Sequence, residues 1–178
     1  RSTYSDWLLK LIPDERYKNS SASFYDANIQ LTHDADEKNS LYFGGYLSRD
    51  RFSMAKDTSY AYQNGSANLK WKHMLNDRFH TLLSLGVDQY QFAVKNTNHP
   101  ATSYDMDYGI TQFFLKADLH HHLHERHRLL YGLSAIRYST RPGRMLPLGE
   151  ASEVVPDIIG QEQALESAIH ITDVYQVS

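Results

Sequence analysis

Apolar and polar residues alternate one by one over long stretches of this chain, and this period of two is the feature that most restricts its fold. In residues 23–33, Tyr25, Ala27, Ile29 and Leu31 are separated by polar side chains. Successive side chains of a β-strand point to opposite faces, so the pattern predicts a strand with one apolar and one polar face. The alternation returns in residues 41–48, 66–72, 79–92, 113–123, 129–136 and 164–172.

The connections between these segments fall into two classes of length. The tight ones are Asp34–Asn39, Asn76–Asp77 and His124–His127. The long, polar ones are Phe52–Asn64, Ala93–Asp105 and Thr140–Glu162. Short and long connections alternate, as they do in outer-membrane barrels, where turns face the periplasm and loops face outside. The sequence therefore predicts an all-β fold, an antiparallel up-and-down transmembrane β-barrel. It would be present as a segment of about seven strands, or eight if Thr3–Leu9 ends a preceding strand.

The composition excludes several other classes of protein. Hydrophobic residues make up 41% of the 178 residues and the mean hydropathy is −0.56. No apolar stretch approaches the ~18 residues of a membrane-spanning helix, whereas alternating strands are compatible with a polar average. The chain has no cysteine and a formal net charge of −3. These values argue against a disulfide-stapled scaffold, a thiolate metal site and a polybasic nucleic-acid binder.

Aromatic residues near the ends of the segments fit the girdles that flank the apolar belt of a membrane barrel. The candidates for these girdles are Trp7, Tyr46, Phe52, Trp71, Phe79, Tyr104 and Tyr138. The alternative is that they are ordinary strand aromatics, since aromatic residues are enriched in strands generally.

Several stretches of the sequence are similar, in order and spacing, to one family. They are RSTYSDWLLK, SASFYDANIQLTHDADEKNSLYFGGYLSRDRFSM, NLKWKHMLNDRF and YGLSAIRYSTRPG. Together they resemble the barrel region of TonB-dependent outer-membrane receptors that carry a carboxypeptidase-like N-terminal extension. The resemblance spans most of the chain. It implies a transporter of about 22 strands with a plugged lumen in a Gram-negative outer membrane. Such a receptor imports a scarce nutrient without chemistry on the substrate.

The resemblance also implies the partners of this chain. Residues 1–178 are expected to be part of a longer receptor, because the chain opens at Arg1 without a signal segment and stops at Ser178 inside an alternating segment. The plug domain and the TonB box would lie outside this sequence. The implied partners are the remaining barrel strands and the plug, the TonB complex through a region not present here, outer-membrane lipid and a surface lipoprotein. Basic residues form no stripe that would suit nucleic acid.

A histidine cluster is the most conspicuous candidate for metal chemistry. It contains His120, His121, His122, His124 and His127. Imidazole is a common metal ligand, but same-face residues on one strand are nearly 7 Å apart, so a site would need a ligand from another strand. No metalloprotease motif is present. We therefore favour a polar hairpin at the periplasmic rim over a metal site, and we expect no cofactor.

The sequence carries no signature of an enzyme. There is no nucleophile elbow and no glycine-rich phosphate loop. The pairs Asp34/Asp36 and Asp105/Asp107 lie in or beside connections, where paired carboxylates are more often solvated turn residues than an acid and base couple. Catalysis is therefore not expected.

Ligand recognition would fall to the long connections, because exposed rings and hydrogen-bonding groups gather there. These residues are Tyr60, Tyr62 and Asn64, then His99 and Tyr104, and then Arg141, Arg144 and Glu150. A sugar, a peptide or a metal chelate would suit them equally, and the residues that contact ligand stay undetermined. The polar side of the strands is expected to carry charged residues that could pack against a plug, namely Lys70, Lys72, Lys116 and Asp118.

Two other functions fit the same pattern. One is a small independent outer-membrane barrel of seven or eight strands that acts as an adhesin or envelope binder. The other is a soluble lipocalin-like binding protein, whose apolar faces would point inward and whose polar faces would point outward.

Overall fold

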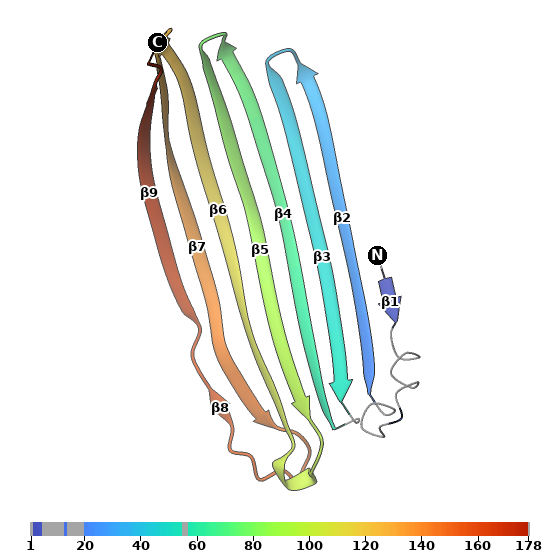
Figure 1. Cartoon of the computed structure of the whole chain (residues 1–178). Helices are drawn as coiled ribbons and strands as arrows, with labels where there is room; N and C mark the ends of the chain where they lie inside the picture. Colours follow the sequence, from blue (N-terminus) through green and yellow to red (C-terminus); the bar gives the residue numbers. More distant parts are fainter. Residues whose placement is uncertain (1, 5–12, 14–19, 55–56, 178) are drawn as a thin grey trace.

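The computed structural model describes residues 2–4, 13, 20–54 and 57–177, and nearly all of them belong to one antiparallel sheet (Figure 1). The strands are β1 (Ser2–Tyr4), β2 (Ser21–Asp36), β3 (Asn39–Met54), β4 (Thr58–Asn76), β5 (Phe79–Asn96), β6 (Tyr104–His124), β7 (His127–Pro147), β8 (Asp157–Ile158) and β9 (Glu162–Tyr175). A short 3-10 helix, η1, covers Pro100–Thr102. Within the described ranges no helix is long and apolar enough to cross a membrane.

The strands follow one another up and down across the sheet. Each of β1 to β7 pairs with the next in sequence, and β9, like the short β8, pairs with β7. The sheet is not closed, because β1 and β9 lie at opposite edges in the part of the chain that the structure describes (Figure 1). The predicted fold class is confirmed: the chain is all-β and up-and-down, consistent with a segment of a β-barrel. β1 contains the start of the predicted segment Thr3–Leu9; residues 5–9 lie outside the described residues.

Side chains at the strand ends determine where the short turns form. The Asp36 carboxylate accepts the backbone N–H of Lys38 at 2.8 Å, and the Asn76 side chain accepts that of Arg78 at 2.9 Å. Both are local Asx hydrogen bonds that favour a tight reversal. Hydrogen bonds from Asn39 and from the Lys38 backbone lower the pKa of Asp36. Its carboxylate therefore stays charged at neutral pH and keeps the turn hydrogen-bonded.

The loops at the opposite end are tied to each other. Ser103 is buried; its hydroxyl donates to the carbonyl of Pro100 at 2.9 Å and also bonds that of Leu148. The Ser152 hydroxyl donates to the Ser103 carbonyl at 2.6 Å, and the Leu148 N–H donates to the same oxygen at 3.0 Å. These bonds hold the connection after β5 against the connection after β7.

The strands are longer than the alternation predicts. The segment Phe52–Asn64, expected as a long loop, is mostly strand: β3 continues to Met54 and β4 begins at Thr58, so only residues 55–57 connect them. Near this end the rings of Phe52, Tyr60 and Tyr62 lie on the opposite face from Leu47, so the pattern that predicts the apolar face ends while backbone pairing continues. The other two long connections are also shorter than expected, at residues 97–103 and 148–161.

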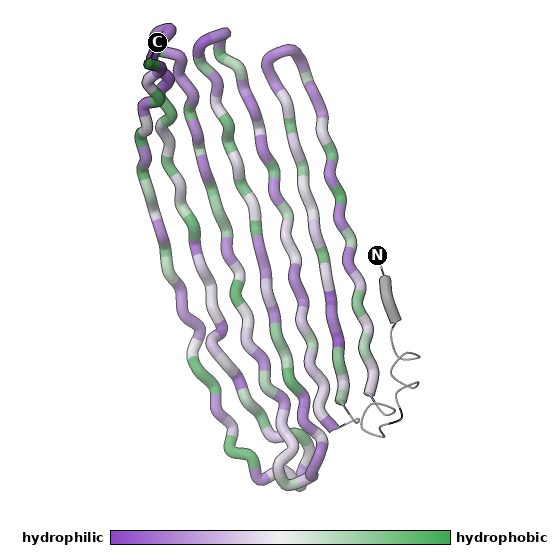
Figure 2. The backbone as a smooth tube through the Cα atoms, viewed as in Figure 1, coloured by the Kyte–Doolittle hydropathy of each residue, from purple (hydrophilic) through white to green (hydrophobic). Residues whose placement is uncertain are grey.

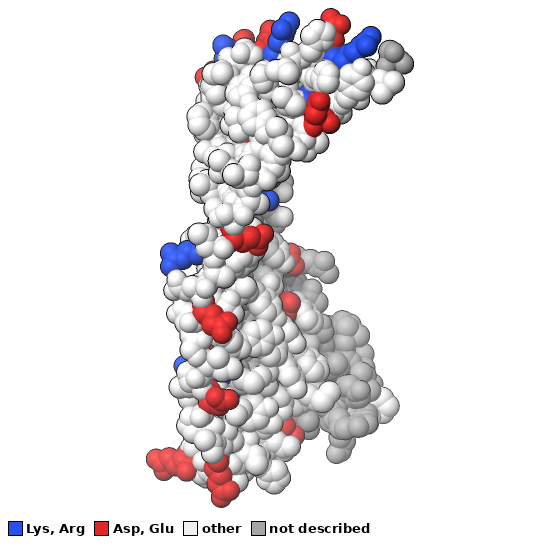
Figure 3. Space-filling model, turned by 90° about the vertical axis from the view of Figure 1, so that its left-hand side faces the viewer, with Lys and Arg blue, Asp and Glu red and all other residues white. Residues whose placement is uncertain are grey.

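The sheet has almost no two-sided core. Among hydrophobic residues in the described part of the chain, only Ala22 and Val94 are buried, and they remain 6% and 5% exposed. Apolar and polar residues alternate along each strand (Figure 2). Seen from the side of β9, charged side chains crowd the end with the short turns (Figure 3). The sheet is therefore one layer with two chemically different faces, and no other element among the described residues covers either face.

Gly132 of β7 provides a test of the register. A Cβ built on Gly132 would overlap the carbonyl oxygen of Ala117 and lie 2.8 Å from the His170 ring. We expect Gly132→Ala to lower the free energy of unfolding of the full chain by about 1–3 kcal/mol. Gly65→Ala is the matched control, since its Cβ would meet only Leu47, at 3.9 Å. Thermal unfolding in detergent measures both; equal midpoints would contradict the register.

Candidate functional site

An apolar band runs across one face of the sheet. The register aligns Leu31, Phe43, Leu69, Leu85 and Leu115 in a single row across five strands. The two neighbouring rows on the same face contain Ile29, Leu41, Trp71, Leu83, Val87, Phe113 and Leu133, and Leu119 lies one row further toward the short turns. All five residues of the first row are between 37% and 56% exposed. We call this face the apolar face and the other the polar face. Contiguous exposed apolar surface of this kind indicates contact with another apolar phase.

The apolar band is inclined to the rows of paired residues. On β2 it covers Tyr25 to Leu31, and on β7 it covers Leu129 to Ala135. On β2 the band ends toward the short turn at Leu31, beyond which this face has only His33 and Ala35. The register aligns Leu31 with Ala135, where the band on β7 ends toward the loops, because Arg137, Ser139 and Arg141 follow on the same face. The band thus shifts by about six residues over five strand-to-strand steps, at ~3.3 Å per residue and ~4.8 Å per step.

This shift defines an angle. The band shifts by about 20 Å along the strands while it crosses about 24 Å of sheet. It is therefore inclined by roughly 40° to the rows of paired residues. Strands of outer-membrane barrels are tilted by ~35–45° from the membrane normal. A belt that is level with a membrane must cross the rows of such strands at the same angle. The band therefore has the slope that a membrane barrel requires.

The register corrects the predicted aromatic girdles. Trp71 and Phe79 lie on the apolar face, near the short turns. Tyr46, Phe52, Tyr104 and Tyr138 are paired with polar-face residues, so they cannot contribute to an outer girdle. Trp7 lies outside the described residues. Trp71 donates its ring N–H to Asn39 at 3.0 Å, which suits an amphipathic ring at a boundary.

An aromatic cluster occupies the polar face toward the long loops. The Phe92 ring lies between those of Tyr62 and Tyr108, with centroids 4.9 Å away on each side. Tyr90 is 6.1 Å from Tyr108. These rings come from β4, β5 and β6, and their strand register brings them together. We define Tyr62, Tyr90, Phe92 and Tyr108 as the aromatic cluster.

A shallow hollow of about 330 Å³ adjoins the aromatic cluster. Its lining includes Tyr46, Asn64 and Tyr90, together with Asp88 and Gln112. The Gln112 amide donates to the Asp88 carboxylate at 2.9 Å, and the Asn64 amide donates to the Ser48 hydroxyl at 3.1 Å. Flat rings next to amide and carboxylate groups can stack on a ligand and hydrogen-bond its polar edges. This surface is the candidate ligand site.

Most of the residues predicted to recognise ligand lie in strands rather than in long connections, and they are divided between the two faces. Tyr60, Tyr62 and Asn64 are in β4 and Tyr104 begins β6; all four lie on the polar face. His99 and Glu150 are in connections, and both are exposed. Arg141 and Arg144 are in β7, on the apolar face. Sequence reasoning found Tyr62 and Asn64 but missed Tyr90, Phe92, Tyr108, Asp88 and Gln112. The period-two pattern places these five residues on the polar face, but only the strand register shows that they lie close together.

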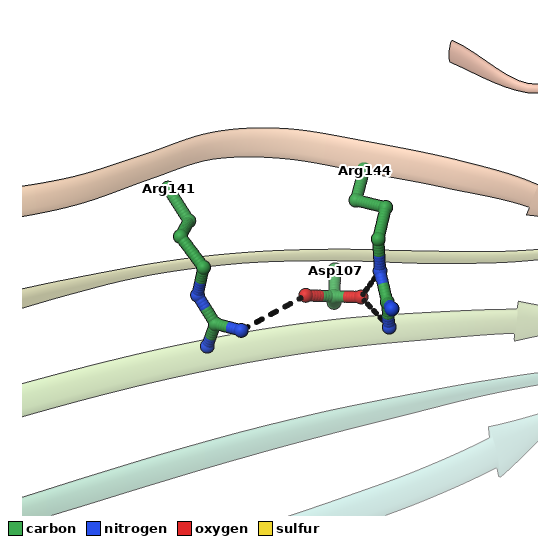
Figure 4. Close-up of polar contacts among 3 residues, drawn as sticks. All are labelled: Asp107, Arg141 and Arg144. Atoms are coloured by element: carbon green, nitrogen blue, oxygen red, sulfur yellow. Dashed lines mark hydrogen bonds and ion pairs between the residues drawn. The ribbon is translucent and has the colours of Figure 1, made fainter. Parts of the chain in front are cut away.

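A polar group interrupts the apolar face beyond the band. Asp107 lies between Arg144, which bonds one carboxylate oxygen at 2.6 and 2.8 Å, and Arg141, 3.9 Å from the other (Figure 4). The two arginines would lie on opposite faces of a regular strand. A register irregularity at Pro142–Gly143, opposite Tyr108, places both beside Asp107. Asp105 and Asp107 are therefore strand residues rather than turn residues.

The histidines form stacked pairs. The rings of His80 and His120, on neighbouring strands, lie 4.7 Å apart at 11°, and His122 lies 6.1 Å from His80. His121 is on the apolar face against Phe79, and His127 pairs with Asp173 at 2.7 Å. In the described part of the chain, no three His, Asp or Glu side chains are arranged to hold a metal ion.

Comparison with known proteins adds no identification. No protein-family model matches the chain. No curated protein matches it either.

Phe92 allows a direct test of the aromatic cluster. Phe92→Leu removes two ring contacts, each of which contributes about 0.5–1.5 kcal/mol, so we expect the free energy of unfolding to fall by about 1–3 kcal/mol. Phe113→Leu is the matched control: Phe113 lies on the apolar face and is 56% exposed. It should change the value by less than about 0.5 kcal/mol. Urea unfolding in detergent gives both values; similar losses would contradict the cluster.

Proposed function

We propose that this chain forms part of the wall of a TonB-dependent outer-membrane receptor, which imports a scarce nutrient without changing it chemically. The observation that carries the proposal is the inclined apolar band. Its exposed side chains need an apolar phase, and acyl chains supply one. Its slope of roughly 40° agrees with strands tilted in a membrane barrel.

The open edges support the same proposal. In lipid, each unpaired backbone group costs several kcal/mol, so a wall must continue into further strands until it closes. The outer edge of β9 has no strand partner among the described residues. The remaining strands of the receptor would pair with it. A lipocalin-like protein is disfavoured because its apolar face would be the covered, inner one.

The polar face would line the lumen. Lys70, Lys72, Lys116 and Asp118 lie on this face, as predicted from their parity. There they could contact a plug, and the aromatic cluster with its hollow, closer to the loops, would meet incoming ligand. The assignment to the TonB-dependent class itself rests on the resemblance of the sequence strings.

Localisation and uptake test this function together. We expect the full-length protein in the outer-membrane fraction, resistant to carbonate extraction. Its deletion should abolish growth on one limiting nutrient, and loss of TonB should have the same effect. Recovery of the protein in a soluble fraction would contradict the membrane assignment. Membrane insertion with uptake that does not need TonB would favour the small independent barrel.

Cysteine labelling provides a matched control inside the chain, which has no cysteine of its own. Leu69 and Lys70 are adjacent and both exposed, as are Leu115 and Lys116, but each pair splits between the two faces. In intact outer membranes, a membrane-impermeant maleimide should label Lys70→Cys and Lys116→Cys at least tenfold faster than Leu69→Cys and Leu115→Cys. Equal rates at adjacent positions would contradict the assignment of the faces.

A further inference from the structure

The apolar face becomes cationic immediately beyond the band. On β3, Leu47 is followed on this face by Arg49, about 7 Å further along the strand. The register aligns Arg49 with Gln63, Gln91, Gly109 and Arg141. The next row contains Arg51, Ala61, Ala93, Asp107 and Arg144. We call Arg49, Arg141 and Arg144 the arginine cluster.

The charges on this part of the face do not balance. On the loop side of the band, the strands described here place Arg49, Arg51, Arg137, Arg141, Arg144 and Lys95 on the apolar face, against Asp105 and Asp107. These eight residues carry +4, and because the formal charge of the whole chain is −3, the rest of the chain carries −7. The positive excess is therefore local, and it borders the apolar band.

Asp107 orients the arginine cluster without neutralising it. One carboxylate is shared between two guanidinium groups, whose side chains remain 56% and 51% exposed. Arg49 is exposed too, and its side chain makes no hydrogen bond or ion pair to any described residue. A hollow of about 410 Å³ lies between the three arginines. The planar guanidinium fork matches the geometry of phosphate oxygens.

We propose that the arginine cluster binds the phosphate group of a membrane lipid in the leaflet on the long-loop side. This inference rests on the proposed function, because it requires the band to contact acyl chains. The occupant follows from continuity: on β3 the band runs directly into Arg49, and one hollow joins Arg49 to Arg141 and Arg144, so an amphiphile with its chains on the band would place its headgroup in this hollow. A free anion would gain nothing from the adjacent apolar surface.

Retention of lipid by the purified full-length protein tests this inference. The probes are phosphatidic acid, which has a phosphate monoester headgroup, diacylglycerol with the same chains, and inorganic phosphate. We expect native mass spectrometry in detergent to show retained phosphatidic acid and little diacylglycerol. Arg141→Gln with Arg144→Gln should weaken phosphatidic acid binding at least tenfold. Arg78→Gln with Arg126→Gln, which removes the same charge at the short turns, should change it less than twofold.

A second variant separates binding from folding. Asp107→Asn removes the carboxylate that competes with phosphate for the guanidinium groups, so phosphatidic acid binding should become severalfold tighter. If the ion pairs were purely structural, this variant would lose stability and would not bind phosphatidic acid more tightly. Unchanged binding in the arginine variant would overturn the inference, and so would displacement of the lipid by inorganic phosphate at similar concentration. A protein that inserts but shows no phosphate preference refutes only this inference. A protein that stays soluble without detergent refutes the proposed function.

Discussion

Hydrogen-bonded pairing between neighbouring strands is the constraint on which the rest of the structure depends. There is almost no buried core, so the backbone ladder fixes the position of each residue relative to the next strand. Because paired residues share a face, one register assembles the apolar band from apolar residues that are separated along each strand. The same register assembles the aromatic cluster on the opposite face. A shift of one residue in any strand would exchange the two faces locally.

The alternation of residue types predicts the two faces because the sequence of a single strand is enough to separate its apolar side from its polar side. Tyr25, Ile29, Leu69 and Leu115 were assigned to the apolar side from parity alone, and the register aligns them there. The strand lengths could not be predicted in the same way. Toward the loops the apolar face loses its apolar residues and ring residues such as Phe52 and Tyr62 lie on the polar face. Parity therefore does not predict that residues 52–54 and 58–64 continue the paired strands.

The relations between strands required the structure. The register places Tyr46 and Tyr138 on the polar face, although their position near segment ends predicts an outer girdle. The contact of Arg141 and Arg144 with a shared Asp107 depends on the irregularity at Pro142–Gly143. A proline and glycine inside a strand are a recognisable signal for such a bulge. The meeting of Phe92 with Tyr62 and Tyr108 depends on register, which one sequence does not specify.

If the band lies level in a membrane while the strands cross the membrane at an angle, residues of one row lie at different depths. Depth-dependent fluorescence quenching measures these depths. Ile29 and Arg137 lie in the same row of the sheet, whereas Leu133 lies two rows closer to the short turns on β7. A fluorophore on a cysteine at each position would be read in bilayers of lipids brominated at different depths. We expect strong mid-chain quenching at Ile29 and Leu133 and little at Arg137. Equal quenching at Ile29 and Arg137, or none at any position, would contradict this expectation.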